Sequence, residues 1–270
     1  MQTETRLERG RKFGAWYVAE YRLRHMSKWI SEILVVSFGN PIIYLLAIGI
    51  GVGSLVEANT SGSGINGVSY LTFLAPALLA TASIQAAMDE TSFPTLEGFV
   101  WNKSFYGMNS TQLGAPQIVD GIMIAALIRA VLTSGVYLIV LLLFGAVVPE
   151  SIPMLFLVAS LAGLSFGALM LAATSFVKED DGFFAIVARF IVAPMFLFSG
   201  TFYPLEQMPV FLQWIGWISP LWHSTNLSRA VSYGLDVPLW LLILHGLFLL
   251  ISLAAGLMIA KRQFKVRLLK

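Results

Sequence analysis

The sequence contains no cysteine and carries little charge. Asp, Glu, Lys and Arg together make up only 12% of its 270 residues. The absence of cysteine excludes disulfide bonds and cysteine-ligated metal sites, and it leaves the compartment undetermined. A soluble domain has about 25% charged residues, so this low charge, together with 57% hydrophobic residues, excludes a soluble domain. The composition predicts a polytopic membrane protein built entirely from α-helices.

Motifs for nucleotide and metal binding are also missing. A P-loop requires G-x-x-x-x-G-K-[ST], and Lys103-Ser104 is preceded by Asn102. The chain therefore has no P-loop with which to hold ATP. The three histidines lie far apart in the sequence and no cluster has metal-ligand spacing, so we expect neither a metal site nor catalytic residues. His223 and His245 are expected to be hydrogen-bonded structural residues.

Six apolar runs are long enough, or nearly so, for the roughly 20 residues that a membrane-spanning helix needs. They lie at Leu34–Val56, Tyr70–Ser92, Ile122–Val148, Met154–Val177, Phe183–Phe202 and Pro238–Ala260. Seven of the 17 Lys and Arg residues precede the first run, five follow the last, and the second and fourth connections have one each. The first and third connections have none. Because basic residues concentrate on the cytoplasmic side, both termini and the even-numbered connections are predicted to be cytoplasmic.

An amphipathic helix is predicted before the first run. From Arg11 onward the apolar residues recur at steps of three or four, at Phe13, Trp16, Ala19, Leu23, Met26, Ile30 and Ile33. Such a helix lies along the membrane surface, either as a lipid anchor or also resting on a partner subunit. The sequence therefore divides into a cytoplasmic N-terminal segment, residues 1–33, a six-helix transmembrane domain, residues 34–260, and a basic cytoplasmic tail, residues 261–270. No cleavable signal peptide is expected, because the first apolar run comes late.

Two arginines fall inside the predicted spans. Arg129 lies about two helical turns inside the third span. Arg189 lies in the fifth span, one to two helical turns after the connection that precedes it. A charge costs about 3 kcal/mol or more at the bilayer centre, and less near an end from which the side chain reaches the surface. We therefore expect both to extend toward the cytoplasmic surface, and Arg129 to pair with Asp89 or Glu90. A contact with substrate is the alternative.

The second connection, residues 93–121, is predicted to be a docking element. A short helix there would place Trp101, Phe105 and Met108 on one face, with Lys103 beside them. Gly114-Ala115-Pro116 would then break this helix before the third span. An exposed helix with aromatic side chains is a common means of docking in the groove of a partner.

The connection between the last two runs, residues 200–237, combines proline and aromatic residues with little charge. Irregular backbone occurs at membrane depth only where protein or a water-lined cavity satisfies the hydrogen bonds of its N–H and C=O groups. We therefore expect a pair of short amphipathic helices that re-enter the membrane surface, delimited by Pro204, Pro209 and Pro220. An apolar face of this stretch would form an outer gate, and a cap over a permease dimer is the alternative. The gate residues are Phe202, Pro204, Phe211, Trp214 and Trp217.

Two of these segments carry a family resemblance. SGTFYPLEQMP followed by ISPLWHSTNLSRAV resembles the pattern S-G-x-x-[FY]-P-x-x-x-[ML]-P…P-L-x-H-x-x-x-L-x-R of type-2 ABC exporter permeases, above all the nodulation-type lipo-oligosaccharide branch. The turn from Ala115-Pro116 to Gly121 also resembles that family, although the acidic residue usual just after the glycine is replaced by Ile122. The resemblance covers most of Ala75–Ala230.

The resemblance implies the permease subunit of an ATP-driven exporter in the bacterial cytoplasmic membrane. Residues 93–121 would contain the coupling helix that takes force from a separate ATPase, and that ATPase would bind ATP and Mg. Two permease chains, identical or paralogous, and two ATPases are implied, with membrane lipid around them. No nucleic acid and no cofactor on this chain are expected. Few charges fall in the spans, so the substrate is expected to be an amphiphile, either a glycolipid or a hydrophobic drug.

Two other classes of function fit a polytopic chain. An intramembrane lipid-modifying enzyme would need converging ionisable groups inside the membrane. An ATP-independent carrier would favour inverted repeats with broken helices in both halves. The sequence shows neither feature. Copurification of an ATPase would support the exporter, and activity by the chain alone would contradict it.

Overall fold

The computed structural model shows an all-helical protein, as the composition predicts. It describes the backbone of residues 2–60 and 62–269 and the side chains of residues 12–60 and 62–269. Met1, Ser61 and Lys270 lie outside the described residues. They belong to the predicted N-terminal segment, the first outer connection and the basic tail.

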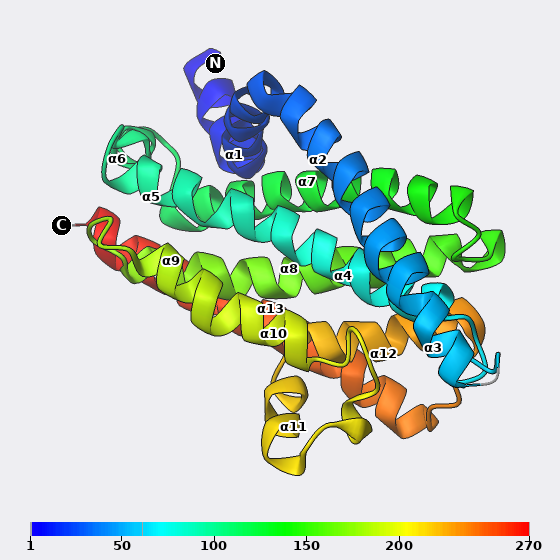
Figure 1. Ribbon diagram of the computed structural model, residues 1–270. Helices are drawn as coiled ribbons and strands as arrows, with labels where there is room; N and C mark the ends of the chain where they lie inside the picture. The colour runs from blue at the N-terminus through cyan, green and yellow to red at the C-terminus, as the bar shows by residue number, and fades with distance from the viewer. Residues whose placement is uncertain (1, 61, 270) are drawn as a thin grey trace.

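The helices follow one another through mostly short connections (Figure 1). They are α1 (Gln2–Met26), α2 (Ile30–Tyr44), α3 (Gly53–Asn59), α4 (Tyr70–Thr91), α5 (Phe93–Phe99), α6 (Ser104–Asn109), α7 (Ala115–Leu143), α8 (Ile152–Phe176), α9 (Phe183–Val187), α10 (Ala193–Phe198), α11 (Val210–Trp217), α12 (Pro220–Tyr233) and α13 (Leu239–Leu268). Two π-helical segments, Leu45–Val52 and Ala188–Val192, join α2 to α3 and α9 to α10.

Five helical stretches of the described chain are long and apolar enough to cross a membrane. They are Lys12–Asn59, Tyr70–Phe99, Ala115–Leu143, Pro149–Phe176 and Leu239–Leu268. The remaining predicted span is a shorter apolar helix, Phe183–Phe198, which ends before Phe202. It ends there because the chain turns at Gly200, whose φ of +74° lies in the left-handed region. The structure thus has five long candidate spans and one short apolar helix where the sequence predicts six spans.

The connections gather at the two ends of the bundle (Figure 1). One end carries both chain ends, the α5 and α6 helices and the α8–α9 connection. The other end carries α3 and the α7–α8 and α12–α13 connections. The segments that the charge distribution places on one side of the membrane therefore lie at one end of the molecule.

The central helix is α8, which contacts α4, α7, α12 and α13. Its small residues allow close helix contact. A Cβ added at Gly163 would lie 2.6 Å from Ser83 Oγ on α4. A Cβ added at Gly256 of α13 would lie 2.5 Å from the carbonyl carbon of Ala168 on α8. Lipid chains are as apolar as leucine side chains, so the hydrophobic effect does not drive helices together within a membrane. Close van der Waals contact of this kind stabilises their packing instead.

The N-terminal helix α1 packs on α7 instead of lying free on a surface. Val18 and Ala19 are buried, and Gly121 permits their approach, since a Cβ there would lie 2.5 Å from Val18 Cβ. Phe13 and Trp16, expected on the same apolar face as Ala19, are exposed. The apolar residues of α1 therefore form a protein-facing stripe and a separate outer stripe. The outer stripe is available to lipid or to a partner, so both predicted roles stay open.

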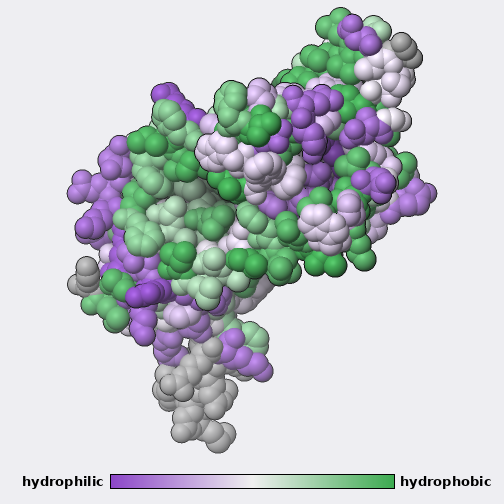
Figure 2. Space-filling model, turned by 90° about the horizontal axis from the view of Figure 1, so that it is seen from below, coloured by the Kyte–Doolittle hydropathy of each residue, from purple (hydrophilic) through white to green (hydrophobic). Residues whose placement is uncertain are grey.

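Hydrophobic side chains cover much of the face seen in Figure 2, and hydrophilic side chains gather along its left edge and over part of its right half. The last helix, α13, continues through most of the predicted basic tail. Within it, Lys261 Nζ lies 2.6 Å from Asp120 Oδ1 of α7. The beginning of the tail thus contacts protein.

Candidate functional site

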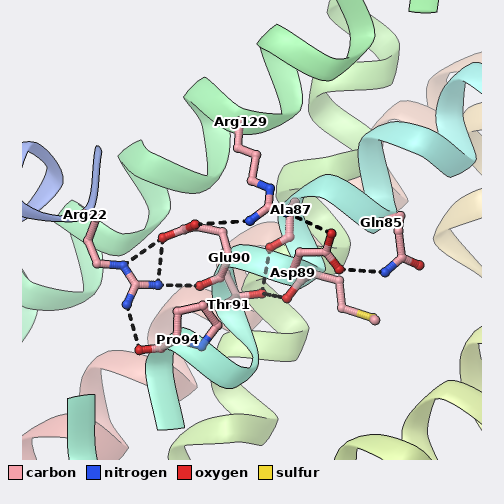
Figure 3. Close-up of polar contacts among 9 residues, drawn as sticks. Arg22, Gln85, Ala87, Asp89, Glu90, Thr91, Pro94 and Arg129 are labelled. Carbon is pink, nitrogen blue, oxygen red and sulfur yellow. Dashed lines mark hydrogen bonds and ion pairs between the residues drawn. The ribbon is translucent and has the colours of Figure 1, made fainter. Parts of the chain in front are cut away.

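Charged side chains from three helices meet beside the α4–α5 junction (Figure 3). Arg22 of α1 donates from Nε to Glu90 Oε1 at 2.7 Å and from Nη2 to the Glu90 carbonyl oxygen at 2.6 Å. Its Nη1 donates to the Pro94 carbonyl oxygen at 2.7 Å. Arg129 of α7 donates from Nη2 to Asp89 Oδ2 at 3.1 Å, and its Nη1 lies 3.6 Å from Glu90 Oε2. These contacts tie α1 and α7 to α4.

The predicted pairing of Arg129 with the two acids is confirmed, whereas sequence reasoning missed Arg22. Both Arg22 and Glu90 are buried. A buried ion pair is favourable only when hydrogen bonds satisfy its remaining donors, and the two backbone carbonyls do so here. The sequence signal that could have identified Arg22 is its spacing. The face of α1 that packs on α7 repeats every four residues, at Gly14, Val18 and Arg22.

Arg189, the other arginine in the predicted spans, lies in the π-helical segment between α9 and α10 and is exposed. Its neighbour Phe190 is exposed as well. Within the described residues no carboxylate forms an ion pair with Arg189. Unlike Arg129, it therefore extends from an apolar outer surface and takes no part in the charge network.

The α5 and α6 helices form a hairpin at the end of the bundle that carries both chain ends (Figure 1). Asn102 fixes the turn by donating from Nδ2 to Glu97 Oε1 at 3.0 Å and by accepting the Ser104 backbone N–H at 2.9 Å. Lys103 has a φ of +53°, a strained value for a residue with a side chain. Trp101, 55% exposed, and Lys103 therefore project from a rigid turn.

Trp101, Phe105 and Met108 do not share one helix face, so that prediction is wrong. The Phe105 ring is fully buried, with its centroid 5.0 Å from that of Phe99 and 5.7 Å from that of Phe264 on α13. Met108 is half-buried against the same cluster. Phe105 and Met108 therefore attach the hairpin to the bundle, whereas Trp101 remains exposed.

Arg267 near the end of α13 joins the hairpin to α8. Its Nη1 donates to the carbonyl oxygen of Val177 at 2.6 Å and to that of Ser175 at 3.2 Å. Its guanidinium carbon lies 3.9 Å from the centroid of the Phe99 ring in α5. These contacts satisfy carbonyls that the C-terminal end of α8 leaves free. The hairpin, α8 and α13 are thereby linked at one point.

The outer stretch contains the two predicted short helices, but only α11 lies on the surface. Pro209 directly precedes α11, Pro220 is the first residue of α12, and Pro204 precedes the 3-10 turn Leu205–Gln207. Three predicted gate residues of α11 are at least half exposed, namely Phe211, Trp214 and Trp217. By contrast, α12 is buried against α4, α8 and α13.

Phe202 and Pro204 do not continue the exposed face of α11, because both are half-buried. The Phe202 ring lies 5.0 Å from the Phe196 ring, centroid to centroid. Its carbonyl oxygen accepts a hydrogen bond from Tyr70 Oη at 3.0 Å. The predicted gate surface is thus divided, with the aromatic residues of α11 outside and Phe202 packed on the bundle.

Arg229 of α12 fastens the outer stretch to α4. It donates from Nη2 to the carbonyl oxygens of Gly200 at 2.8 Å and Thr201 at 3.3 Å, and from Nε to that of Phe73 at 3.3 Å. Its guanidinium carbon also lies 3.6 Å from the Phe73 ring centroid. Arg229 is only 4% exposed. Sequence reasoning assigned Arg229 no role, although the family pattern contains both the S-G pair and this arginine.

His223 and His245 contact each other, although the sequence separates them. Their Nδ1 atoms lie 2.7 Å apart, and His223 Nε2 lies 3.0 Å from the Trp217 carbonyl oxygen. A carbonyl oxygen only accepts, so His223 carries its proton on Nε2 and accepts at Nδ1. The hydrogen-bonded structural role predicted for His223 and for His245 is confirmed. Among the described residues, no group of His, Asp and Glu could hold a metal.

Sequence comparison identifies proteins related to this chain. A family model described as ABC-2 type transporter matches residues 22–233. Nodulation protein J of Rhizobium leguminosarum bv. viciae is 30% identical over 224 residues, which cover 82% of this chain and 83% of that protein. Nodulation protein J of Neorhizobium galegae is 30% identical over 205 residues, 76% of each chain. No solved structure matches this chain. The chain therefore belongs to the ABC-2 type transporter family, as a multi-pass membrane permease that lacks an ATP-binding site of its own.

Proposed function

We propose that this permease exports an amphiphile, most specifically a glycolipid, across the bacterial cytoplasmic membrane. A separate ABC ATPase would bind ATP and Mg, since the permease has no site for them. A second permease chain, identical or paralogous, would complete the complex within the lipid bilayer. Six crossings, with both termini and the α5–α6 hairpin in the cytoplasm, are part of the proposal. The similarity to nodulation protein J supports an export function.

The α5–α6 hairpin is the observation that supports this function best. Trp101 and Lys103 are exposed at its turn, which lies at the end of the molecule that carries both termini. Phe105 joins the hairpin to α13, and Arg267 joins it to α8. A force applied at the turn would thus reach two helices of the bundle through packed contacts. This is the mechanical arrangement that coupling to an ATPase requires.

The outer stretch supports an amphiphilic substrate. The aromatic residues of α11 are exposed close to the point where the short helix α10 ends. Arg229 holds the base of this stretch to α4. In our proposal, the apolar part of the substrate passes α11 as it leaves toward the outer leaflet. A hydrophobic drug would use the same surface and is the alternative substrate.

Copurification tests the function. The tagged chain is expressed with the ABC ATPase encoded nearest to it, extracted in a mild detergent and recovered by its tag. We expect the ATPase to be retained, and to be retained much less by Trp101→Ala. Trp240→Ala is the control, because Trp240 is 65% exposed near the start of α13, at the opposite end of the molecule. Failure of the wild type to retain any ABC ATPase would contradict the proposal.

A further inference from the structure

A pocket of about 340 Å³ lies between the α1–α2 junction and helices α4 and α7, beside the charge network. Pockets that bind small molecules enclose roughly 300 to 1,000 Å³. This pocket therefore has room for a headgroup but not for a whole lipid. Its wall is rich in hydrogen-bonding side chains, including Glu32, Asn40, Gln85, Asp89, Arg129 and Thr133.

The charges around the pocket select among headgroups. Asp89 and Glu90 face Arg22 and Arg129, so the inner wall is close to neutral (Figure 3). Glu32 is exposed and adds a negative charge without an ion-pair partner among the described residues. His25 also lines the pocket. A phosphate or other anion would still meet the Glu32 carboxylate, which is a like charge. An uncharged headgroup meets no such repulsion.

The polar side chains suit a group with many hydroxyls. An amide presents both a donor and an acceptor, and Gln85 uses its Nε2 to donate to Asp89 Oδ1 at 2.8 Å, which leaves its oxygen able to accept. Asn40 is exposed on the α2 side of the same pocket. Hydroxyl groups both donate and accept, so they match amides on two facing helices.

The mouth of the pocket joins an apolar surface. Trp29 and Val36 line the pocket and are each 54% exposed. The Trp29 ring offers a large flat apolar face with a polar edge. Further along α2, Ile43 is also exposed. A lipid chain attached to a bound headgroup could therefore leave the pocket past Val36 and lie along α2.

We propose that this pocket binds the uncharged, hydroxyl-rich headgroup of the exported amphiphile, with Asn40, Gln85 and Arg129 as its hydrogen-bonding contacts. The inference rests on the proposed function for the existence of an amphiphilic substrate, and it adds a site and a headgroup chemistry. Binding precedes transport, so it requires neither the ATPase nor ATP. The charge network then serves to hold Arg129 in place at the pocket wall.

A photoreactive alkyl maltoside tests this site on the purified full chain in phosphatidylcholine nanodiscs. We expect crosslinks to residues of the pocket and a rise of about tenfold in the dissociation constant for Gln85→Ala and for Val36→Trp. Two matched variants should bind like the wild type. Val35→Trp alters the neighbouring valine, which is 71% exposed and does not line the pocket, and Gln112→Ala removes an exposed amide elsewhere.

Equal weakening by Val36→Trp and Val35→Trp would overturn the inference. So would equal competition by an alkyl sulfate or an alkyl trimethylammonium compound of the same chain length. Both valines are exposed, so the comparison of Val36→Trp with Val35→Trp tests the inference even if Gln85→Ala fails to fold. The assay contains no ATPase, so its result is independent of copurification. Specific maltoside binding by a chain that retains no ATPase would uphold this site and contradict only the export proposal.

Discussion

Arg229 of α12 donates a hydrogen bond to the carbonyl oxygen of Gly200 at 2.8 Å, although 29 residues separate them. Gly200 ends the short apolar helix in a left-handed conformation, and Arg229 lies in the helix that returns into the bundle. Their contact closes the outer stretch into a loop. The exposed helix α11 therefore projects from a fixed base, and the proposed exit surface keeps its position relative to α4.

This contact predicts that Arg229→Lys destabilises the permease. A lysine has a single nitrogen and cannot replace the planar fork that reaches Gly200 and Phe73 together. We expect a loss of about 2 kcal/mol, seen as a lower midpoint of thermal unfolding in detergent. Arg262→Lys, at an exposed position of α13, is the control. Equal midpoints for the two variants would show that Arg229 does not hold the stretch.

The ion pair between Arg22 and Glu90 predicts strong coupling in a double-mutant cycle. Both side chains are about 95% buried, so removal of one leaves the other without its partner in a buried site. We expect a coupling free energy of about 2 kcal/mol from alanine variants. The exposed pair Arg24 and Glu20 on the same helix should give about 0.5 kcal/mol or less. The measurement is thermal unfolding of each variant, and similar coupling in both pairs would contradict the role of Arg22.

The hairpin predicts different outcomes for two aromatic residues that lie four positions apart. Trp101→Ala should lower substrate-stimulated ATPase activity of the complex and leave thermal stability unchanged, because Trp101 is exposed. Phe105→Ala should instead destabilise the chain by about 3 kcal/mol or more, because it removes a buried ring. Both quantities are measured on the same preparations. Unchanged coupling in Trp101→Ala would remove the hairpin from the docking surface.

Topology is tested with introduced cysteines, since the native chain has none to interfere. Cysteines at positions Ser63 and Asp236 should react with an impermeant thiol reagent added to intact cells. Cysteines at Ser104 and Asp181 should react only after permeabilisation. The reason is the positive-inside distribution of Lys and Arg. Labelling of position 104 in intact cells would contradict the proposed orientation.

Hydropathy predicted most of the helical architecture, because a spanning helix is a local property of about 20 residues. The boundaries were less accurate. For example, α7 begins at Ala115, with Pro116 in its first turn, whereas the predicted span begins at Ile122. A proline is tolerated in the first turn of a helix, where its missing N–H has no partner to bond. The break at Ala115-Pro116 is therefore a helix start.

The contacts of the site depend on distant residues, so sequence reasoning found only part of them. Phe105 is buried because Phe264, far along the chain, lies against it. No local pattern distinguishes such a residue from an exposed docking contact. Arg129 could be paired with the acids because all lie near the same ends of adjacent spans. Arg22 could not, because its partner depends on how α1 folds back onto α7.

The central claim is that this permease moves an amphiphile outward only when an ATPase drives it. The most direct measurement uses inside-out membrane vesicles that contain the chain and its copurifying ATPase, and follows a headgroup-labelled glycolipid into the lumen. The account predicts that added ATP makes the label inaccessible to a quencher outside, and that a catalytically inactive ATPase abolishes this protection. Protection of the label in vesicles that contain the permease alone would contradict this account. A label that stays accessible to the quencher when both active subunits and ATP are present would also contradict it.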